Sequence, residues 1–145
     1  MITITYPQPD FRIKKETGNE FIFDSLRKKW VALTPEEWVR QNFIQYLIKE
    51  KKIPASLIAV EKEIKLGEMK KRFDILVYDN DHQPWMMIEC KATDIKLDEA
   101  VLQQVLRYNI SMPVKCLVIT NGSTAYAWTK HNNTLQPAGE IPGWE

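Results

Sequence analysis

The strongest constraint on the fold is a pair of strand-like runs, residues 72–77 and 87–92, that carry charge where a strand normally buries hydrocarbon. A polar loop, residues 80–84, lies midway between them and predicts a β-hairpin. A symmetric hairpin around this loop places Asp74 directly opposite Glu89, with Cβ atoms about 5 Å apart on one face. Two carboxylates that close repel each other and are costly to ionise among apolar neighbours, and a divalent cation removes both penalties.

Lys91 completes a candidate site with these two acids. It lies two residues after Glu89, so its side chain emerges on the same face of the strand, whereas Cys90 points to the opposite face and is expected in the core. The alternative interpretation is a partly buried ion network without a catalytic role. Because buried ion pairs are weak stabilising devices, the third charge beside the two acids favours a functional site.

The order Asp74 followed by Glu89-Cys90-Lys91 resembles the PD-(D/E)XK nuclease motif, in particular that of the N-terminal nuclease domain of type I restriction enzyme R subunits. The resemblance covers roughly residues 25–130 and implies a restriction-endonuclease-like α/β fold. Further elements resemble the same family in the same order: residues 33–40, Gln104 and Tyr108 spaced as Gln-x-x-x-Tyr, and residues 119–122.

The resemblance also implies a cofactor and residue roles. Mg²⁺, with Mn²⁺ as a substitute, would be held by Asp74, Glu89 and the main-chain carbonyl of Cys90, which suits a cation that prefers oxygen ligands. Lys91 would orient the attacking water or stabilise the negative charge that develops on the phosphate. Gln104 would orient the Lys91 region or contact a phosphate.

Many nucleases of this fold carry a further metal-facing glutamate on the first helix, and two candidates exist here. Thr34 begins the predicted helix as its N-cap, and Glu37 has the spacing of a capping-box residue. Glu36 shares helical spacing with Val39 and Phe43, which places it toward the sheet. We therefore slightly favour Glu36 as the additional metal ligand.

Contacts with the substrate are expected from residues near the acids. Lys70 and Lys71 precede the first acidic strand and are candidates for salt-sensitive contacts with DNA phosphates, although a basic loop is usually only solvated. Arg72 opens the strand and is a candidate for the same role or for pairing with an acid. Tyr108 shares a helix face with Gln104 and is either a core residue or a substrate contact.

Composition limits the class of protein. The chain has 145 residues, two cysteines and a net charge of +1, so a nucleic-acid partner must be met by a local basic patch rather than by a global field. Cys90 and Cys116 lie in apolar runs and indicate buried thiols in a reducing compartment. No apolar run approaches the ~18 residues of a membrane span, and the N-terminus lacks signal-peptide features, so we expect a cytoplasmic protein with no membrane partner.

The periodicity predicts a mixed β-sheet flanked by helices. The helices are expected at residues 34–51 and 98–110, and the strands at residues 57–64, 72–79, 85–92, 114–120 and, as an edge strand, 124–128. Glu61 and Glu63 alternate on the first of these strands and are expected on its solvent face. The passage from Glu89 to Thr120 predicts a crossover between parallel strands.

A single domain with three parts is expected. Residues 1–33 would form an N-terminal β-hairpin extension, residues 34–130 the nuclease-like core, and residues 131–145 an irregular tail. Nothing in the chain resembles the Walker A loop that a translocating ATPase motor would need, which predicts a stand-alone domain.

These features predict metal-dependent hydrolysis of DNA phosphodiesters by a stand-alone restriction-type nuclease domain. The alternative is a catalytically idle module that binds nucleic acid or a partner protein of a restriction or repair system. Paired cuts in the two strands of a duplex would favour a homodimer.

Overall fold

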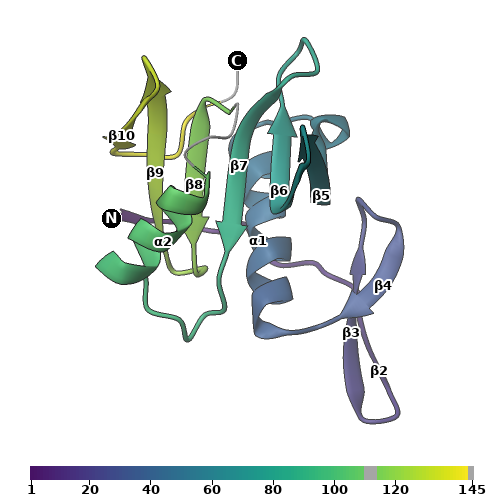
Figure 1. Ribbon diagram of the computed structural model, residues 1–145. Coiled ribbons are helices and arrows are strands. Elements are labelled where there is room, and N and C mark those ends of the chain that lie inside the picture. The colour runs from purple at the N-terminus through teal and green to yellow at the C-terminus, as the bar shows by residue number, and fades with distance from the viewer. Residues whose placement is uncertain (110–113, 144–145) are drawn as a thin grey trace.

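The computed structural model describes residues 1–109 and 114–143, without the side chains of Leu66, Met69 and Tyr108. Its centre is a seven-stranded mixed sheet in the order β1-β9-β8-β7-β6-β5, with β10 also paired to β9 (Figure 1). The strands of this sheet are β1 (Ile2–Thr3), β5 (Ile58–Leu66), β6 (Met69–Tyr78), β7 (Pro84–Cys90), β8 (Cys116–Thr120), β9 (Thr124–His131) and β10 (Thr134–Ala138).

Two helices cover the opposite faces of the sheet, α1 (Pro35–Lys49) on one and α2 (Glu99–Asn109) on the other (Figure 1). A short 3₁₀ helix, η1 (Ala55–Leu57), leads from α1 into β5. Helix α2 connects β7 to β8, which pair in parallel, so the predicted crossover is confirmed. Every residue of β8 is buried, as expected of a strand covered on both faces.

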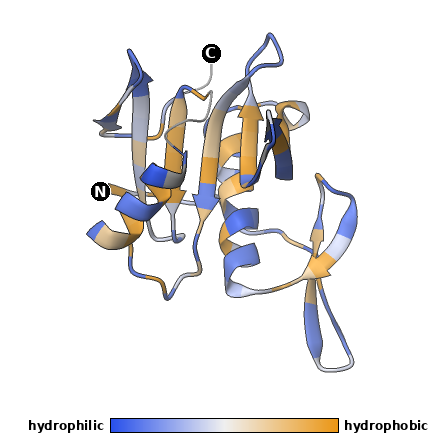
Figure 2. Cartoon of the chain, viewed as in Figure 1, coloured by the Kyte–Doolittle hydropathy of each residue, from blue (hydrophilic) through white to orange (hydrophobic). Residues whose placement is uncertain are grey.

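The sheet separates two hydrophobic clusters. One lies under α1 and contains Phe43, Ile75 and Ile88. The other lies under α2 and contains Leu76 and Met87, among other residues. Neighbouring residues of β6 and β7 therefore alternate between the two cores, and Figure 2 shows hydrophobic residues along β6 and β8.

The central hairpin has the predicted register. Ile75 pairs with Ile88, Leu76 with Met87, and Val77 with Met86, before a register shift at Tyr78. Continued by one step, this register makes Asp74 and Glu89 the next opposed residues. The hydrophobic alternation fixes this register, since a slip of one residue would exchange the two faces of the strand.

A separate three-stranded sheet, which we call the hairpin sheet, lies beside α1 and comprises β2 (Ile13–Glu16), β3 (Asn19–Asp24) and β4 (Lys29–Ala32) (Figure 1). The N-terminal hairpin expected within residues 1–33 is present, since β2 and β3 pair antiparallel, and in the turn between them Gly18 adopts a φ of 82°, a conformation that glycine tolerates without steric cost. The first turn of α1 is also as predicted, because the Thr34 hydroxyl accepts a hydrogen bond from the Glu37 main chain at 3.0 Å.

Three expectations about strands are wrong. Strand β9 is not an edge strand, because β8 pairs with one side of it and β1 and β10 pair with the other. Residues 134–138, expected to be irregular, form β10, where Pro137 is tolerated because β10 lies at the edge of the sheet. Residues 66–71, expected to be a loop, mostly extend β5 and β6 around a turn at Gly67, whose φ is 61°.

Within the described part of the chain, no helix combines the length and the apolar character needed to cross a membrane.

The central position of Ile88 predicts a large loss of stability when its side chain is truncated. Ile88 is fully buried, so Ile88→Ala should lower the free energy of unfolding by about 2–5 kcal/mol. Ile13 of the hairpin sheet is 47% exposed, and Ile13→Ala should change the free energy by about 0.5 kcal/mol or less. Urea unfolding of both variants tests this, and similar losses in the two would contradict the assigned core.

Candidate functional site

The candidate site lies where the β6–β7 ladder ends. Main-chain pairing runs as far as Ile75 and Ile88, one step before the two acids. The Cys90 main-chain N–H donates to Asp74 Oδ2 at 2.7 Å, so a side-chain carboxylate accepts a hydrogen bond at the point where the ladder stops. The Lys91 main-chain N–H donates to the Thr120 carbonyl at 2.8 Å, which keeps β7 attached to β8 through the site.

Asp74 affects the ionisation of Glu89. Burial is the largest cause that raises the pKa of Glu89, and the charge of Asp74 and a hydrogen bond with Asp74 raise it further. The charge of Lys91 lowers the pKa of Glu89, but the net result lies well above the ordinary value for a glutamate. The structure therefore brings together the three residues of the sequence motif, in surroundings that disfavour the ionised form of Glu89.

A cavity of about 230 Å³ opens beside this triad, lined by Glu89, Lys91, Gln104, Val105 and Asn109. Gln104 is exposed and lines this cavity together with Lys91. Asn109 donates from Nδ2 to the Val105 carbonyl at 2.8 Å, and its buried Oδ1 lacks a hydrogen-bond partner among the described residues. Asn109 was not among the expected site residues, although it lies five residues after Gln104.

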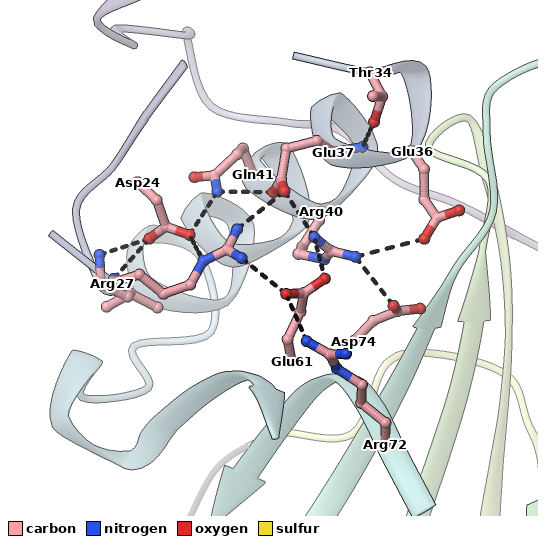
Figure 3. A network of polar contacts seen from close by, with 11 residues as sticks. Asp24, Arg27, Thr34, Glu36, Glu37, Arg40, Gln41, Glu61, Arg72 and Asp74 are labelled. Atoms are coloured by element: carbon pink, nitrogen blue, oxygen red, sulfur yellow. Dashed lines mark hydrogen bonds and ion pairs between the residues drawn. The ribbon is translucent and has the colours of Figure 1, made fainter. Parts of the chain in front are cut away.

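The acids of α1 differ in their surroundings. The Glu36 carboxylate is 49% exposed and lies 3.5 Å from Arg40 Nη2, on the side of Arg40 where Asp74 is found (Figure 3). Its charge also raises the pKa of Glu89, which places it in the electrostatic surroundings of the site. The Glu37 carboxylate is buried and accepts hydrogen bonds from Arg27, Arg40 and Gln41. Glu37 therefore connects three polar side chains, in addition to occupying the capping-box position that the sequence predicts for it.

Arg40 connects α1 to the candidate site. Its guanidinium lies 2.7 Å from Glu37 Oε1 and 3.1 Å from Asp74 Oδ1, and the residue is only 5% exposed (Figure 3). Together with the Cys90 N–H, Arg40 gives each carboxylate oxygen of Asp74 a donor. Two charge-assisted hydrogen bonds hold this carboxylate in a fixed orientation.

The same network continues into the hairpin sheet. Arg27, which follows β3, donates to Asp24 Oδ2 at 2.6 Å and to Glu37 Oε1 at 2.9 Å. Gln41 donates to Asp24 Oδ2 at 3.0 Å, so a residue of α1 also contacts the buried Asp24 directly (Figure 3). A chain of polar contacts therefore runs from the hairpin sheet through Glu37 and Arg40 to Asp74.

The orientation of Glu61 differs from the sequence-based expectation. We expected it on the solvent face of its strand with Glu63, but its carboxylate lies 3.2 Å from both Arg27 and Arg72 and 3.6 Å from Arg40. Its φ of 52° interrupts the regular alternation of β5, which is why the period-two pattern misplaced it. Arg40 was also not among the expected site residues, although its spacing of three residues from Glu37 is that of a helical ion pair.

The expected substrate contacts are placed as follows. Lys70 and Arg72 are exposed on β6, and Arg72 pairs with Glu61, as one of its two expected roles requires. Lys71 is only 6% exposed, so, unlike Lys70 and Arg72, it does not present its charge on the surface. The Tyr108 side chain lies outside the described residues. The Cys90 side chain is buried in the core under α1, as predicted, and burial raises its pKa well above the ordinary value, which makes a thiolate nucleophile unfavourable.

The donor set suits a hard divalent cation such as Mg²⁺ or Mn²⁺ better than zinc. The described residues contain no cluster of three or more His, Cys, Asp or Glu side chains arranged to hold an ion. Mg²⁺ is commonly bound through one or two carboxylates and keeps several waters, which the opposed Asp74 and Glu89 satisfy. Zinc sites usually need three or four nitrogen or sulfur ligands, and these are missing from the described part of the site.

A comparison with known protein families identifies the family of this chain. The model of the family described as "Type I restriction enzyme R protein N terminus" matches residues 35–142, which is well over half of the chain. The chain therefore belongs to this family and is related to restriction systems. A search of curated proteins found no match.

Removal of the Arg40 guanidinium should destabilise the protein strongly. Arg40→Met leaves Glu37 buried without one of its cations, which typically costs about 3–5 kcal/mol in the free energy of unfolding. The matched control is Arg72→Met, because Arg72 also pairs with an acid but its side chain is 67% exposed, and its loss should cost about 1 kcal/mol or less. Equal losses in urea unfolding at neutral pH would refute the central place given to Arg40.

The hydrogen bonds to Asp24 predict a specific pH dependence. Burial raises the pKa of Asp24, but hydrogen bonds from the main chain and side chain of Arg27 and from Gln41 lower it, and the net pKa is below the ordinary value. When folding lowers the pKa of a carboxyl, that carboxyl stabilises the fold at pH values above its unfolded-state pKa of about 3.9. This stabilisation is lost as the pH falls through the folded-state pKa. The stability difference between the wild type and Asp24→Asn should therefore be constant near neutral pH and shrink below about pH 4. Urea unfolding across this range measures it, and a difference independent of pH would contradict the assignment.

Proposed function

We propose that this member of the type I restriction enzyme R protein N-terminus family hydrolyses DNA phosphodiesters with a bound Mg²⁺, as a PD-(D/E)XK nuclease. The proposal rests on one observation. Asp74, Glu89 and Lys91 lie together at the end of the β6–β7 ladder, beside a cavity that is also lined by Gln104. The raised pKa of Glu89 supports the proposal, because burial and the nearby charge of Asp74 disfavour the Glu89 carboxylate, and a bound cation would stabilise it.

Asp74 and Glu89 would be the protein ligands of the cation, with the Cys90 carbonyl as the further ligand that the family resemblance implies. The Cys90 N–H and Arg40 already fix the orientation of the Asp74 carboxylate. When bound, Mg²⁺ would polarise a phosphoryl oxygen and lower the pKa of an attacking water. Glu36 would contribute negative charge from α1 without needing to enter the first coordination sphere.

Lys91 would act on the phosphate or on the attacking water. Lys91 lines the same cavity as Glu89, so its positive charge would lie near the negative charge that develops during phosphodiester hydrolysis. Gln104 lines the cavity from α2 and would orient the substrate through its amide. Lys70 is exposed on β6, four residues before Asp74, and would contact a DNA phosphate.

One observation favours the second candidate, a catalytically idle module that binds DNA or a restriction-system partner. Arg40 already supplies a positive charge to Asp74, so part of the role of a metal ion is filled by a side chain. Such a module would keep its fold and its binding surface and would not cleave DNA.

Cleavage of supercoiled plasmid and of single-stranded DNA, with Mg²⁺ or Mn²⁺, tests the proposal. Wild type should cleave, and Asp74→Asn and Lys91→Ala should each reduce the rate by at least about a hundredfold, since each removes a group that acts on the developing charge. Gln103→Ala is the matched control, because Gln103 lies beside Gln104 on α2 but bonds to Glu99 instead of lining the cavity.

Cleavage that survives in folded Asp74→Asn or Lys91→Ala would refute the assigned site. An inactive wild type at high enzyme concentration and low salt would refute the nuclease proposal and favour the idle binding module.

A further inference from the structure

One face of the hairpin sheet gathers aromatic and basic side chains. The register of its strands places Phe23 opposite Trp30, and the Phe23 N–H donates to the Arg12 carbonyl at 2.9 Å, so Arg12, Phe23 and Trp30 form one cross-strand row. Lys14 lies two residues after Arg12 and therefore emerges on the same face. We call Arg12, Lys14, Phe23 and Trp30 the basic face.

The rings of this face hold its cations in place. Phe23 and Trp30 pack edge to face with centroids 5.4 Å apart. The Arg12 guanidinium lies 4.8 Å from the Phe23 centroid and 5.4 Å from that of Trp30, while the Lys14 ammonium lies 4.5 Å from the Trp30 centroid. These cation–π contacts restrict two long side chains that would otherwise be free to move.

The opposite face of the hairpin sheet is used for attachment to the rest of the protein. Ile22 and Asp24 point to that face and are fully buried. Asp24 is bonded to Gln41 of α1, and Arg27 joins it to Glu37. The hairpin sheet is thus fixed to the helix whose Arg40 contacts Asp74, and its basic face remains partly exposed.

The positive charge of the protein is concentrated in this region. Residues 11–33 contain six basic and three acidic residues, whereas the rest of the chain contains 14 basic and 16 acidic residues. Of the six, Arg27 is engaged in the polar network with Asp24 and Glu37. Lys14 also pairs with Glu16 at 3.1 Å, but both side chains are substantially exposed, so this pair is weak. Arg12, Lys15, Lys28 and Lys29 are exposed.

We propose that the basic face binds the phosphate backbone of DNA and holds the duplex next to the Asp74 site. The proposal rests on the proposed function, since it names the surface by which that site would receive its substrate. A backbone-binding surface needs ordered cations rather than a base-reading element, and ordered cations lose less entropy on binding. This surface lies before residues 35–142, the part of the chain that the family model matches.

Fluorescence anisotropy with a short labelled DNA duplex tests the proposal directly. The full chain carrying Lys91→Ala is used in EDTA, so that binding is measured without cleavage. Adding Arg12→Gln and Lys14→Gln should weaken binding several-fold and lower the slope of log affinity against log salt by about two, one for each lost phosphate contact. Adding Trp30→Leu should weaken binding without any change of charge, because it releases both cations from their ring.

The matched control is Lys52→Gln. Lys52 is exposed and follows the C-terminal end of α1, away from the hairpin sheet, so its loss removes one charge from another surface and should leave the affinity and the salt slope nearly unchanged. Circular dichroism establishes that each variant is folded.

Three results would overturn the inference: a parent protein that does not bind the duplex, a folded Arg12→Gln/Lys14→Gln variant that binds as tightly as the parent, or a control that loses as much affinity as this variant. The outcome is separable from that of the nuclease assay. Plasmid cleavage with unchanged binding in the double variant would overturn this inference alone. Binding that depends on the basic face without any cleavage by wild type would support it and refute the nuclease proposal.

Discussion

The buried guanidinium of Arg40 is the interaction on which the rest of the structure depends. It is the point where α1, the hairpin sheet and the central sheet meet, because it pairs with Glu37 within its own helix and with Asp74 on β6. Glu37 in turn is held by Arg27, which follows β3. A buried charge network of this kind contributes little net stability, but removing one partner is costly because another charge is left unpaired in the interior. The network therefore specifies how the three parts fit together more than it strengthens the fold.

The location of the candidate site follows from the end of regular pairing. As far as Ile75 and Ile88, the hairpin uses its main chain for pairing and its side chains for the two cores. One step later, side-chain carboxylates take the place of apolar groups, and the Cys90 N–H bonds to Asp74 instead of a main-chain carbonyl. The parallel β7–β8 ladder continues to Lys91, so Glu89 and Lys91 lie on a stretch of chain that remains paired with β8. On the other edge of β7, pairing with β6 has already ended. Fixed strands that carry a charged pair at an opening provide the rigidity that a functional site requires.

The sequence predicted the central hairpin, the start of α1 and the crossover because the patterns that specify them are local in the chain. The hairpin register, the helix start at Thr34 and the β7–α2–β8 crossover all follow from alternation, capping and connection length. The sequence did not predict the pairing of β1 with β9, because residues 2–3 and 124–125 are far apart in the chain and the short β1 has no pattern of its own.

The role of Arg40 was missed for a related reason. The role of an arginine on the apolar side of a helix can be assigned only when its acidic partners are known, and Asp74 lies on a strand that is distant in sequence. Glu61 was misplaced because a single residue with positive φ changes the side to which a strand residue points, and no residue type at that position signals it.

The measurement that tests the central claim most directly is Mn²⁺ binding, followed by the electron paramagnetic resonance signal of the free ion, in the wild type, Asp74→Asn, Glu89→Gln and Lys91→Ala. If Asp74 and Glu89 form a cation site, the wild type and Lys91→Ala should bind Mn²⁺, and the two acid variants should lose most of their affinity. A folded wild type that binds no Mn²⁺, or acid variants that bind it as well as the wild type does, would contradict the account and leave the acids and Lys91 as a structural ion network.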